Sequence, residues 1–400
     1  RQDLASQASL NPSQRGAIGA ALQRRCTVIQ GPPGTGKTTT AIHVLKSWAA
    51  LGLKPVLATA DGNIAVDNIA EGLARLGVKV VRVGRPEKVR GPLEEVTLDA
   101  KLAARKAQAQ KERDTDLEVK LFERRKQRTL ELERLQIRDV RNIAEELKLD
   151  LSVSSLAARA KQARKAAKAE ELRAATAAGE EDKRAAGDSG GAAPDAQEPP
   201  SAIDAVVGAV LDAEEERERE RLKLPEVLEA EKRARRREAQ VFQKELLQEA
   251  EVICAQMISA GGNFLAQLGP FHGILVDEVA QATELTTIVP IVQRGCERLV
   301  LAGDHCQLPP TVQSQEAEQR GLTLSLYGRL VGDGVRPFFL DIQFRSHPKL
   351  AEFCAEAIYE GRLKSGVDAE ARPLLGGFAW PKKKVPVAFV EAGGSAPEGS

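Results

Sequence analysis

The sequence of 400 residues lacks any apolar run close to the roughly 18 residues that a membrane-spanning helix needs. This absence excludes an integral membrane protein. The chain also lacks a strong net charge, because 58 lysines and arginines against 57 aspartates and glutamates leave +1. Any contact with nucleic acid must therefore be local. Hydrophobic residues, at 42%, are numerous enough to build cores, which excludes wholesale disorder.

Cysteine and methionine are scarce. The five cysteines are odd in number and contain no C-x-x-C pair, which argues against both a disulfide framework and a cysteine-rich zinc site. This pattern predicts free thiols in an intracellular protein, cytoplasmic or nuclear. Met257 is the only methionine, so position 1 is not an initiator and we expect the chain to be part of a longer protein. The polar start RQDLASQ does not have the pattern of a signal peptide.

Aromatic rings are nearly absent from the middle of the chain. Residues 101–250 contain only Phe122 and Phe242. Of these 150 residues 64 are charged, against 51 in the other 250. A segment so charged and so poor in rings is not expected to form a globular core.

Two parts of this middle segment predict helices. Apolar residues recur at helical spacing in Lys101–Leu149 and in Glu214–Ala250, where Pro225 predicts a break or kink. Residues 178–201 are rich in Ala, Gly, Pro and charge, and predict a disordered linker. We therefore expect a helical stalk over 101–250. Its charges predict a solvated helix surface, with direct nucleic-acid contact by some basic residues as the alternative.

The segments on either side of the stalk alternate short β-rich runs with helical stretches. Continuous apolar strands separated by helices predict an α/β domain, a buried parallel sheet with helices on both faces, over about 10–329. The stalk is then an insertion into this domain. After Gly332 a further strand, Pro337–Asp341, is expected to open a second unit. The strands expected in the domain are Cys26–Gln30, Pro55–Thr59, Lys79–Val83, Val252–Met257, Gly273–Asp277 and Arg298–Ala302.

The sharpest motif is GPPGTGKT, Gly31–Thr38, between an expected strand and an expected helix. Its glycines let the backbone wrap a phosphate chain, and the helix N-terminus points amide groups at it. We expect Lys37 to reach the β- and γ-phosphates and the Thr38 hydroxyl to coordinate Mg²⁺. The other residues assigned to the nucleotide here are Gly34, Thr35, Gly36 and Thr39.

A pair of carboxylates ends another expected strand, in GILVDEVAQ. Nucleotide hydrolysis needs such an element on a neighbouring strand. We expect Asp277 to hold the magnesium, directly or through water, and Glu278 to orient and deprotonate the attacking water.

Two further loops complete the pattern. In Leu301–Thr311, a strand exit stiffened by two prolines, Gln307 could place its amide beside the γ-phosphate. In DIQFRSHP, Asp341–Pro348, Arg345 is a candidate arginine finger and Phe344 could stack on the base. Taken alone, the first segment would be an ordinary loop and the second a charged surface.

In this order, the motifs QGPPGTGKTTT, VDEVAQ, LAGDHCQLPPT and QFRSHP resemble those of superfamily 1 helicases. The resemblance is to the branch that contains the nonsense-mediated-decay helicase and the immunoglobulin-mu-binding helicase. It covers about 10–102 and 251–363. The segment LNPSQRGAI resembles the Q-motif of this branch, which implies that Gln14 lies on the adenine edge.

The resemblance implies two RecA-like domains with ATP and Mg²⁺ between them, and movement 5′ to 3′ along single-stranded RNA or DNA. It implies that Gln307 is the γ-phosphate sensor, Arg345 one of two arginine fingers and Phe344 the adenine-stacking ring. It predicts no membrane partner and identifies no protein partner. The expected divisions are residues 1–100 and 251–331 for the two halves of the first RecA-like domain, 101–250 for the stalk, and 332–400 for the start of the second domain.

The chain departs from the family pattern in three places. Motif Ia is ATADGN, Ala58–Asn63, where a Pro-Ser/Thr-Asn run is usual. Gln256 stands where a threonine is usual, so two expected nucleic-acid contacts are altered. Motifs V and VI, with the second finger, are absent from these 400 residues.

Two hypotheses from other classes compete with the helicase. A structural coiled-coil ATPase would also combine a P-loop with long helices, but needs an S-G-G signature that opens a helix. Here Ser189–Gly191 lies inside the expected linker. The other alternative is a nucleic-acid-binding scaffold with a weakened motor, against which the intact Lys37, Asp277 and Glu278 argue.

Overall fold

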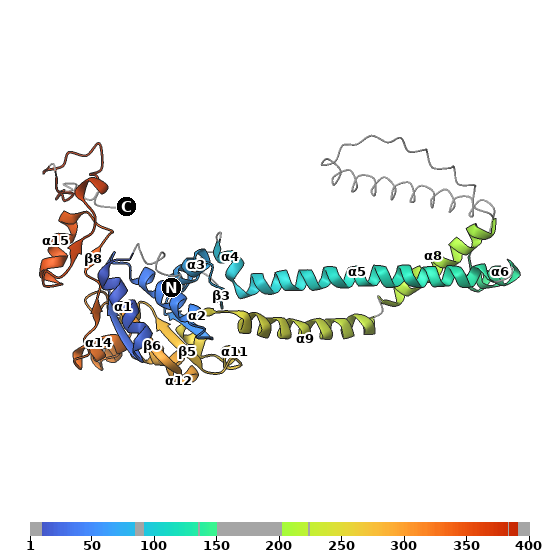
Figure 1. The fold of residues 1–400 in the computed structure, drawn as a ribbon, viewed down its shortest axis with the longest axis horizontal. Helices are drawn as coiled ribbons and strands as arrows, with labels where there is room; N and C mark the ends of the chain where they lie inside the picture. Colours follow the sequence, from blue (N-terminus) through green and yellow to red (C-terminus); the bar gives the residue numbers. More distant parts are fainter. Residues whose placement is uncertain are drawn as a thin grey trace, which may run out of the picture. The chain divides into compact units, whose positions relative to one another are not determined.

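Seven parallel strands form the main sheet of the protein (Figure 1). The computed structural model describes residues 10–84, 92–134, 137–149, 202–222, 225–382 and 384–390. The strand order is β3-β4-β2-β5-β6-β1-β7. These strands are β1 Cys26–Gln30, β2 Val56–Ala60, β3 Val80–Arg82, β4 Val252–Gln256, β5 Phe271–Val276, β6 Cys296–Gly303 and β7 Phe338–Phe339. The parallel sheet confirms the α/β fold predicted from the sequence.

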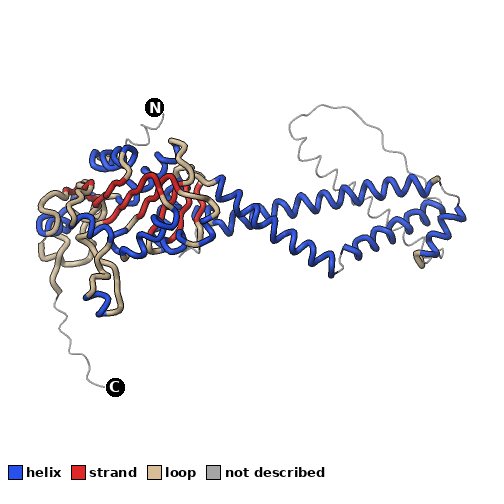
Figure 2. Tube along the Cα trace, turned by 90° about the horizontal axis from the view of Figure 1, so that it is seen from below, coloured by secondary structure: helices blue, strands red, loops and turns tan. Residues whose placement is uncertain are grey.

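Helices cover both faces of this sheet, which lies as a layer among them in Figure 2. Side chains alternate between the faces along each strand, so Val56 and Ala58 of β2 pack on one side and Leu57 on the other. On the first side lie α1 Pro12–Gln23, α2 Lys37–Ala50, α3 Asn63–Arg75 and α4 Pro92–Val96. On the second lie α10 Met257–Gly261, α11 Asn263–Ala266, η1 Val279–Gln281, α12 Glu284–Arg294 and α14 Leu326–Gly332.

The strand expected to open a second unit belongs to the first sheet instead. Phe338 and Phe339 of β7 pair with Ile29 and Gln30 of β1, so β7 is the seventh strand. Without β7 the strand β1 would be the edge of the sheet, and the pairing gives partners to backbone groups of β1 that would otherwise have none in the sheet. The second, two-stranded sheet comes later. The remaining elements of this part are α13 Gln315–Gln319, β8 Ile342–Gln343, α15 Pro348–Ala357, β9 Lys364–Ser365 and η2 Ala369–Ala371.

The described chain divides into two compact units. One comprises described residues of 1–105 and 239–400, and the other those of 106–238. Within the first, the bases of two long helices lie beside each other, since Arg105 is 3.8 Å from Glu245 and 3.7 Å from Glu249. These distances join Arg105 Nη2 to a carboxylate oxygen of each glutamate. The long helices are α5 Leu98–Glu133 and α9 Pro225–Glu249.

The second unit is helical, as predicted, but the prediction of no core in 101–250 was wrong. Leu132, Val140, Ala144 and Val210 are buried in a small apolar cluster. The charge count overlooked the apolar run 205–211, which opens α8 Ala202–Leu222 and packs on α6 Ile137–Glu146. Pro225 begins α9, where proline is tolerated because the first turn needs no amide donor. The linker predicted at 178–201 lies outside the described residues.

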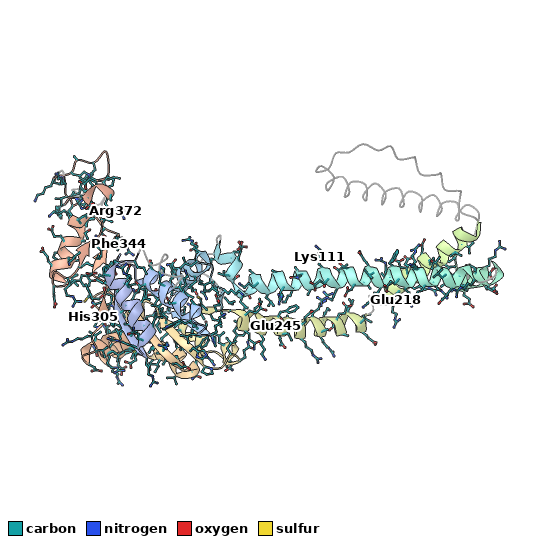
Figure 3. All side chains as sticks on the ribbon, in the orientation of Figure 1. Lys111, Glu218, Glu245, His305, Phe344 and Arg372 are labelled. Carbon is teal, nitrogen blue, oxygen red and sulfur yellow. The ribbon has the colours of Figure 1, made fainter. Side chains whose placement is uncertain are left out.

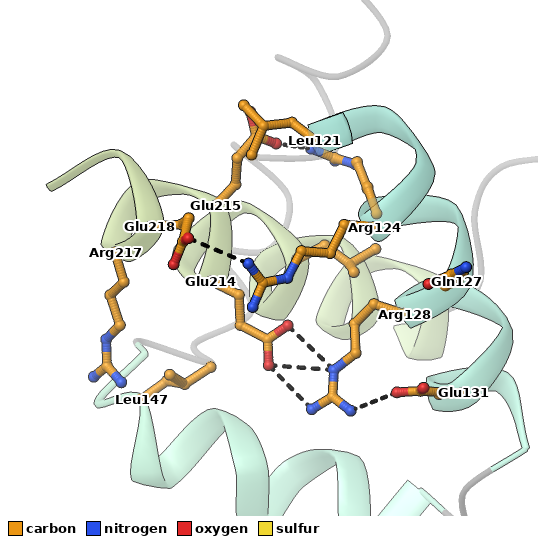
Figure 4. A pocket seen from close by; sticks show the side chains of 12 residues that line it. Leu121, Arg124, Gln127, Arg128, Glu131, Leu147, Glu214, Glu215, Arg217 and Glu218 are labelled. Carbon is orange, nitrogen blue, oxygen red and sulfur yellow. Dashed lines mark hydrogen bonds and ion pairs between the residues drawn. The ribbon is translucent and has the colours of Figure 1, made fainter. Parts of the chain in front are cut away.

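Three arginines of α5 pair with carboxylates of α8, among them Arg125 and Arg128. Arg128 bonds Glu214, and Arg125 bonds Asp212 and Glu215. These pairs line a cavity of about 560 Å³ that also exposes Leu121 and Leu147 on its walls (Figure 4). Most of these side chains remain partly exposed, and such pairs contribute about 0–1 kcal/mol each. The arrangement agrees with the predicted solvated helix surface.

Among the residues that the structure describes, none of the helices combines the length and the apolar character that crossing a bilayer requires.

Candidate active site

The loop between β1 and α2 has a backbone shape that only glycine adopts easily. Gly34 and Gly36 have φ of 78° and 79°, in the left-handed region. A Cβ atom at Gly36 would lie 2.7 Å from Gln14 Nε2, and one at Gly34 would lie 2.5 Å from Arg345 Cβ. Among the described residues no side chain caps α2, whose first amide groups are therefore open to an anion.

Lys37, the first residue of α2, lies within this loop. Its Nζ donates to the carbonyl oxygen of Gly31 at 2.9 Å and lies 3.6 Å from Glu278 Oε1. Only 9% of the side chain is exposed. The ammonium group is thus folded back on the loop and still borders the cavity.

Thr38 and Asp277 come together from α2 and from the end of β5. The Thr38 hydroxyl donates to Asp277 Oδ2 at 3.2 Å. Asp277 is fully buried. Burial, and then the neighbouring Glu278 carboxylate, raise the pKa of Asp277 to about 6. A hydroxyl and a carboxylate oxygen are ligands that Mg²⁺ prefers, and a bound cation would offset the cost of ionising this buried acid. The donor set therefore fits the metal that the sequence predicts.

Glu278 stands in an unusual backbone conformation. Its φ of 51° places a residue other than glycine in the left-handed region, a strain of order 1–3 kcal/mol that concentrates at functional sites. Its side chain is one-third exposed and faces Lys37. Its Oε2 accepts from Gln281 Nε2 at 3.2 Å. Glu278 is thus held at the cavity wall, from which solvent can reach it.

Gln14 is fixed at both ends of its amide. Its Oε1 accepts from the backbone amide of Asn11 at 3.0 Å, completing a capping box at the start of α1. Its Nε2 donates to the carbonyl of Thr35 at 3.0 Å. Gln14 therefore ties α1 to the loop and lines the cavity. Thr35 itself is fully buried, and its hydroxyl donates to the carbonyl of Pro32 at 2.7 Å.

Phe344 and Arg345 reach the same loop from the segment after β8. The amide of Phe344 donates to the carbonyl of Gly34 at 2.9 Å. Gln343 Oε1 accepts from the amide of Arg345, and Arg372 donates to the carbonyls of Phe344 and Arg345 at 2.7 and 3.0 Å. Figure 3 marks Phe344 and Arg372 in this part of the chain. These bonds hold the segment against the loop.

Most of the predicted residues line a cavity of about 600 Å³. It is large enough for a mononucleotide. Thr35, Asp277 and Gln307 lie outside its lining, although Asp277 and Gln307 contact residues close to it. The lining consists of Leu10, Gln14, Pro32, Gly34, Gly36, Lys37, Thr38, Thr39, Glu278, Phe344 and Arg345.

Gln307 follows β6 and is held by Asp304. Its Nε2 donates to Asp304 Oδ2 at 2.7 Å and lies 3.4 Å from the carbonyl oxygen of Gly31. Lys37 donates to that same carbonyl. Two side chains that the sequence assigns to the terminal phosphates therefore share one backbone acceptor.

The two departures from the expected motifs meet in the structure. Gln256, at the end of β4, donates from Nε2 to the carbonyl of Asp61 at 3.1 Å. Nearby, Arg82 is buried and bonds Asp67 at 2.7 Å and Asn63 at 2.8 Å. These bonds shape the loop and the first turn of α3 at the carboxyl edge of the sheet.

Sequence reasoning missed several side chains that support the site. Gln281, Gln343, Arg372 and Asp304 each hold a predicted residue or its backbone. Gln281, Gln343 and Asp304 lie within the recognised motifs, which was the available signal. Arg372 lies far along the chain in an irregular segment, and only the fold brings it to Phe344.

Two family models, each described as an AAA domain, match residues 9–315 and 322–400. The chain is 30% identical over 383 residues to the regulator of nonsense transcripts 1 homolog of Drosophila melanogaster. This match covers 95% of the present chain and 24% of the relative. The homolog of Arabidopsis thaliana is 30% identical over 95% of this chain and 22% of the relative. The ATP-dependent helicase NAM7 of Saccharomyces cerevisiae is 28% identical over 96% of this chain and 29% of the relative.

The chain spans about a quarter of the length of these curated relatives. The AAA-domain match extends through the glycine loop, the Asp277–Glu278 pair and the loop that carries Gln307, and the second match contains Phe344 and Arg345. The chain therefore belongs to the AAA-domain family of superfamily 1 helicases, in the branch of the regulators of nonsense transcripts.

Proposed function

We propose that this chain is the ATP-hydrolysing part of a helicase that moves 5′ to 3′ along single-stranded RNA or DNA. One observation carries the proposal. Lys37, Glu278 and Arg345, from three separate segments, line a single cavity whose loop can bind a phosphate chain. The match to helicase relatives supports the same reaction.

Each residue has a role in this reaction that its position supports. Lys37 moves its ammonium from the Gly31 carbonyl to the β- and γ-phosphates, which are stronger acceptors. Thr38 and Asp277 would hold magnesium, which when bound would supply positive charge to offset that of the phosphates. Gln14 contacts the adenine edge, and Phe344 stacks on the ring.

The hydrolytic step uses Glu278 as the base. Its partly exposed carboxylate can accept a proton from a water molecule in line with the γ-phosphate. Gln307 and Arg345 place hydrogen-bond donors on the charge that develops on the transferred phosphoryl group. Lys37 Nζ, 3.6 Å from Glu278 Oε1, places a positive charge beside this carboxylate.

The nucleic-acid strand is proposed to cross the carboxyl edge of the sheet near Asp61 and Gln256. The names of the relatives refer to transcripts, which favours RNA. An intracellular location, cytoplasmic or nuclear, is supported by the five cysteines, all of which are free thiols.

The test is ATP turnover by the full-length protein with poly-RNA and poly-DNA added separately. We expect stimulation by at least one polymer, and unwinding of duplexes that carry a 5′ but not a 3′ single-stranded tail. Lys37→Ala should reduce turnover by about 10²–10³-fold. Lys54→Ala, on a half-exposed lysine before β2 at the opposite edge of the sheet, is the matched control.

Polymer binding without any turnover would instead support a scaffold with a weakened motor. Turnover that no polymer changes would support a structural ATPase.

A further inference from the structure

Asp304 is a buried carboxylate that receives four hydrogen bonds. It follows β6 directly and is 1% exposed. Its Oδ1 accepts from Gln30 Nε2 at 3.1 Å and from the amide of Cys306 at 3.2 Å. Its Oδ2 accepts from Gln307 Nε2 at 2.7 Å and from the hydroxyl of Tyr359 at 2.8 Å. Both oxygens are therefore saturated, and the plane of the carboxylate is determined by its donors.

Tyr359 is the donor that comes from farthest along the chain. It follows α15, and its side chain is 5% exposed. Its ring lies 6.1 Å from that of Phe339, between centroids. Burial, and then the bond to Asp304, raise the pKa of Tyr359, so the hydroxyl keeps its proton and acts as the donor.

Asp304 in turn orients Gln307. A side-chain amide has two N–H groups. One is engaged by Asp304 Oδ2, and the weak 3.4 Å contact with Gly31 leaves the other available to a stronger acceptor. An oxygen of a γ-phosphate is such an acceptor. Rotation of the Asp304 carboxylate would turn this second N–H away.

We propose that Tyr359 is a positioning residue for the γ-phosphate sensor: its hydroxyl holds Asp304 in the orientation that presents Gln307 to the triphosphate. The inference rests on the proposed function of Gln307. It also extends that function, because Tyr359 belongs to the segment after β8 that carries Phe344 and Arg345. The sensor is correctly oriented only when this segment is seated on Asp304.

The chain offers a matched control in a second buried tyrosine. Tyr327 is fully buried, and burial, followed by the charge of Asp304, raises its pKa. Among the described residues its hydroxyl has no hydrogen-bond partner. Tyr359→Phe and Tyr327→Phe therefore remove the same atom near the same carboxylate, and only the first removes a bond to it.

The experiment measures binding of ADP and of a non-hydrolysable ATP analogue, together with kcat and KM for ATP, in the full-length protein. For Tyr359→Phe we expect ADP affinity within twofold of the unmodified protein, because ADP lacks the γ-phosphate. We expect the analogue to bind about 10–100-fold more weakly and kcat to fall by a similar factor, the effect of one charge-assisted bond. Tyr327→Phe should leave all of these values within twofold.

The variants Gln307→Ala and Gln307→Ala/Tyr359→Phe locate the effect. If Tyr359 acts through Gln307, the double variant matches Gln307→Ala. Additive losses, or equal losses of ADP and analogue binding in Tyr359→Phe, would assign Tyr359 a general structural role and overturn the inference. Another outcome is that Gln307→Ala loses the difference between the affinities for the ATP analogue and for ADP while Tyr359→Phe behaves like Tyr327→Phe. In that case the inference fails and the proposed function stands. If Gln307→Ala changes nothing, the sensor role itself is wrong.

Discussion

The side-chain amide of Gln256 donates a 3.1 Å hydrogen bond to the backbone carbonyl of Asp61. The bond joins the ends of neighbouring strands β4 and β2 at the edge where parallel sheets carry their ligand sites. Two positions that depart from the family pattern are thus joined directly, and the amide of Gln256 holds the loop that follows β2.

Gln256→Ala should therefore weaken single-strand binding by about 2–10-fold, the usual net effect of one neutral hydrogen bond. Binding of ATP should be unchanged. Fluorescence anisotropy with labelled single strands measures the first quantity. The control is Gln267→Ala, on an exposed side chain before β5 at the opposite edge. Equal strand affinity in both variants would contradict a role for this loop in strand binding.

Glu278→Gln should retain nucleotide binding and lose hydrolysis. The amide keeps the shape of the side chain but cannot accept a proton, so turnover should fall by about 10²–10⁴-fold. Equilibrium binding of ATP and a phosphate-release assay separate the two effects. Glu297→Gln, on an exposed glutamate at the start of β6, should turn over normally. Loss of nucleotide binding in Glu278→Gln would show that the residue is structural.

Asp277 should make the stability of the nucleotide-free protein depend on pH. Because its pKa is raised to about 6 in the folded protein, from an ordinary 3.8, the folded state favours the protonated acid. The contribution of protonated Asp277 to the free energy of unfolding is fully present below pH 4. It is lost as the pH rises through about 6. Ionised Asp277 then costs on the order of 3 kcal/mol above pH 6.

Asp277→Asn should accordingly raise Tm at pH 8 and leave it nearly unchanged at pH 4. It should also abolish the further rise in Tm that magnesium and nucleotide together produce in the unmodified protein. Thermal unfolding at the two pH values measures both effects. A lower Tm than that of the unmodified protein at pH 8 would show that ionised Asp277 is stabilised by its surroundings.

Arg82 and Asp67 form a buried ion pair whose loss should be costly. Arg82→Met leaves the Asp67 carboxylate buried without this guanidinium, so the free energy of unfolding should fall by about 3–5 kcal/mol. Chemical denaturation measures the change. Arg75→Met, which breaks the more exposed pair with Glu71 on α3, should cost less than about 1 kcal/mol. Similar losses of stability in the two variants would mean that breaking the buried Arg82–Asp67 pair costs no more than breaking an exposed pair.

Several features were predictable from the sequence because their cause is local. Glycines at 34 and 36 and a lysine and threonine at the start of a helix specify the phosphate-binding loop by spacing alone. Six of the seven strands of the first sheet were predicted there because buried parallel strands are continuous apolar runs. Apolar residues at helical spacing in 101–149 and 214–250 correctly predicted long helices. The charge count, by averaging over 101–250, concealed the apolar run that builds their small core.

Only the tertiary structure decided which distant residues meet. It placed β7 beside β1, brought the hydroxyl of Tyr359 to Asp304 and the guanidinium of Arg372 to the backbone of Phe344. None of these contacts leaves a periodic signal, because each depends on how separate segments pack on the sheet. The raised pKa of Asp277 likewise arises from burial at the end of β5, and the left-handed backbone of Glu278 lies in the turn between β5 and η1. The sequence by itself determined the chemical groups of the site, and packing determined their orientation and their partners.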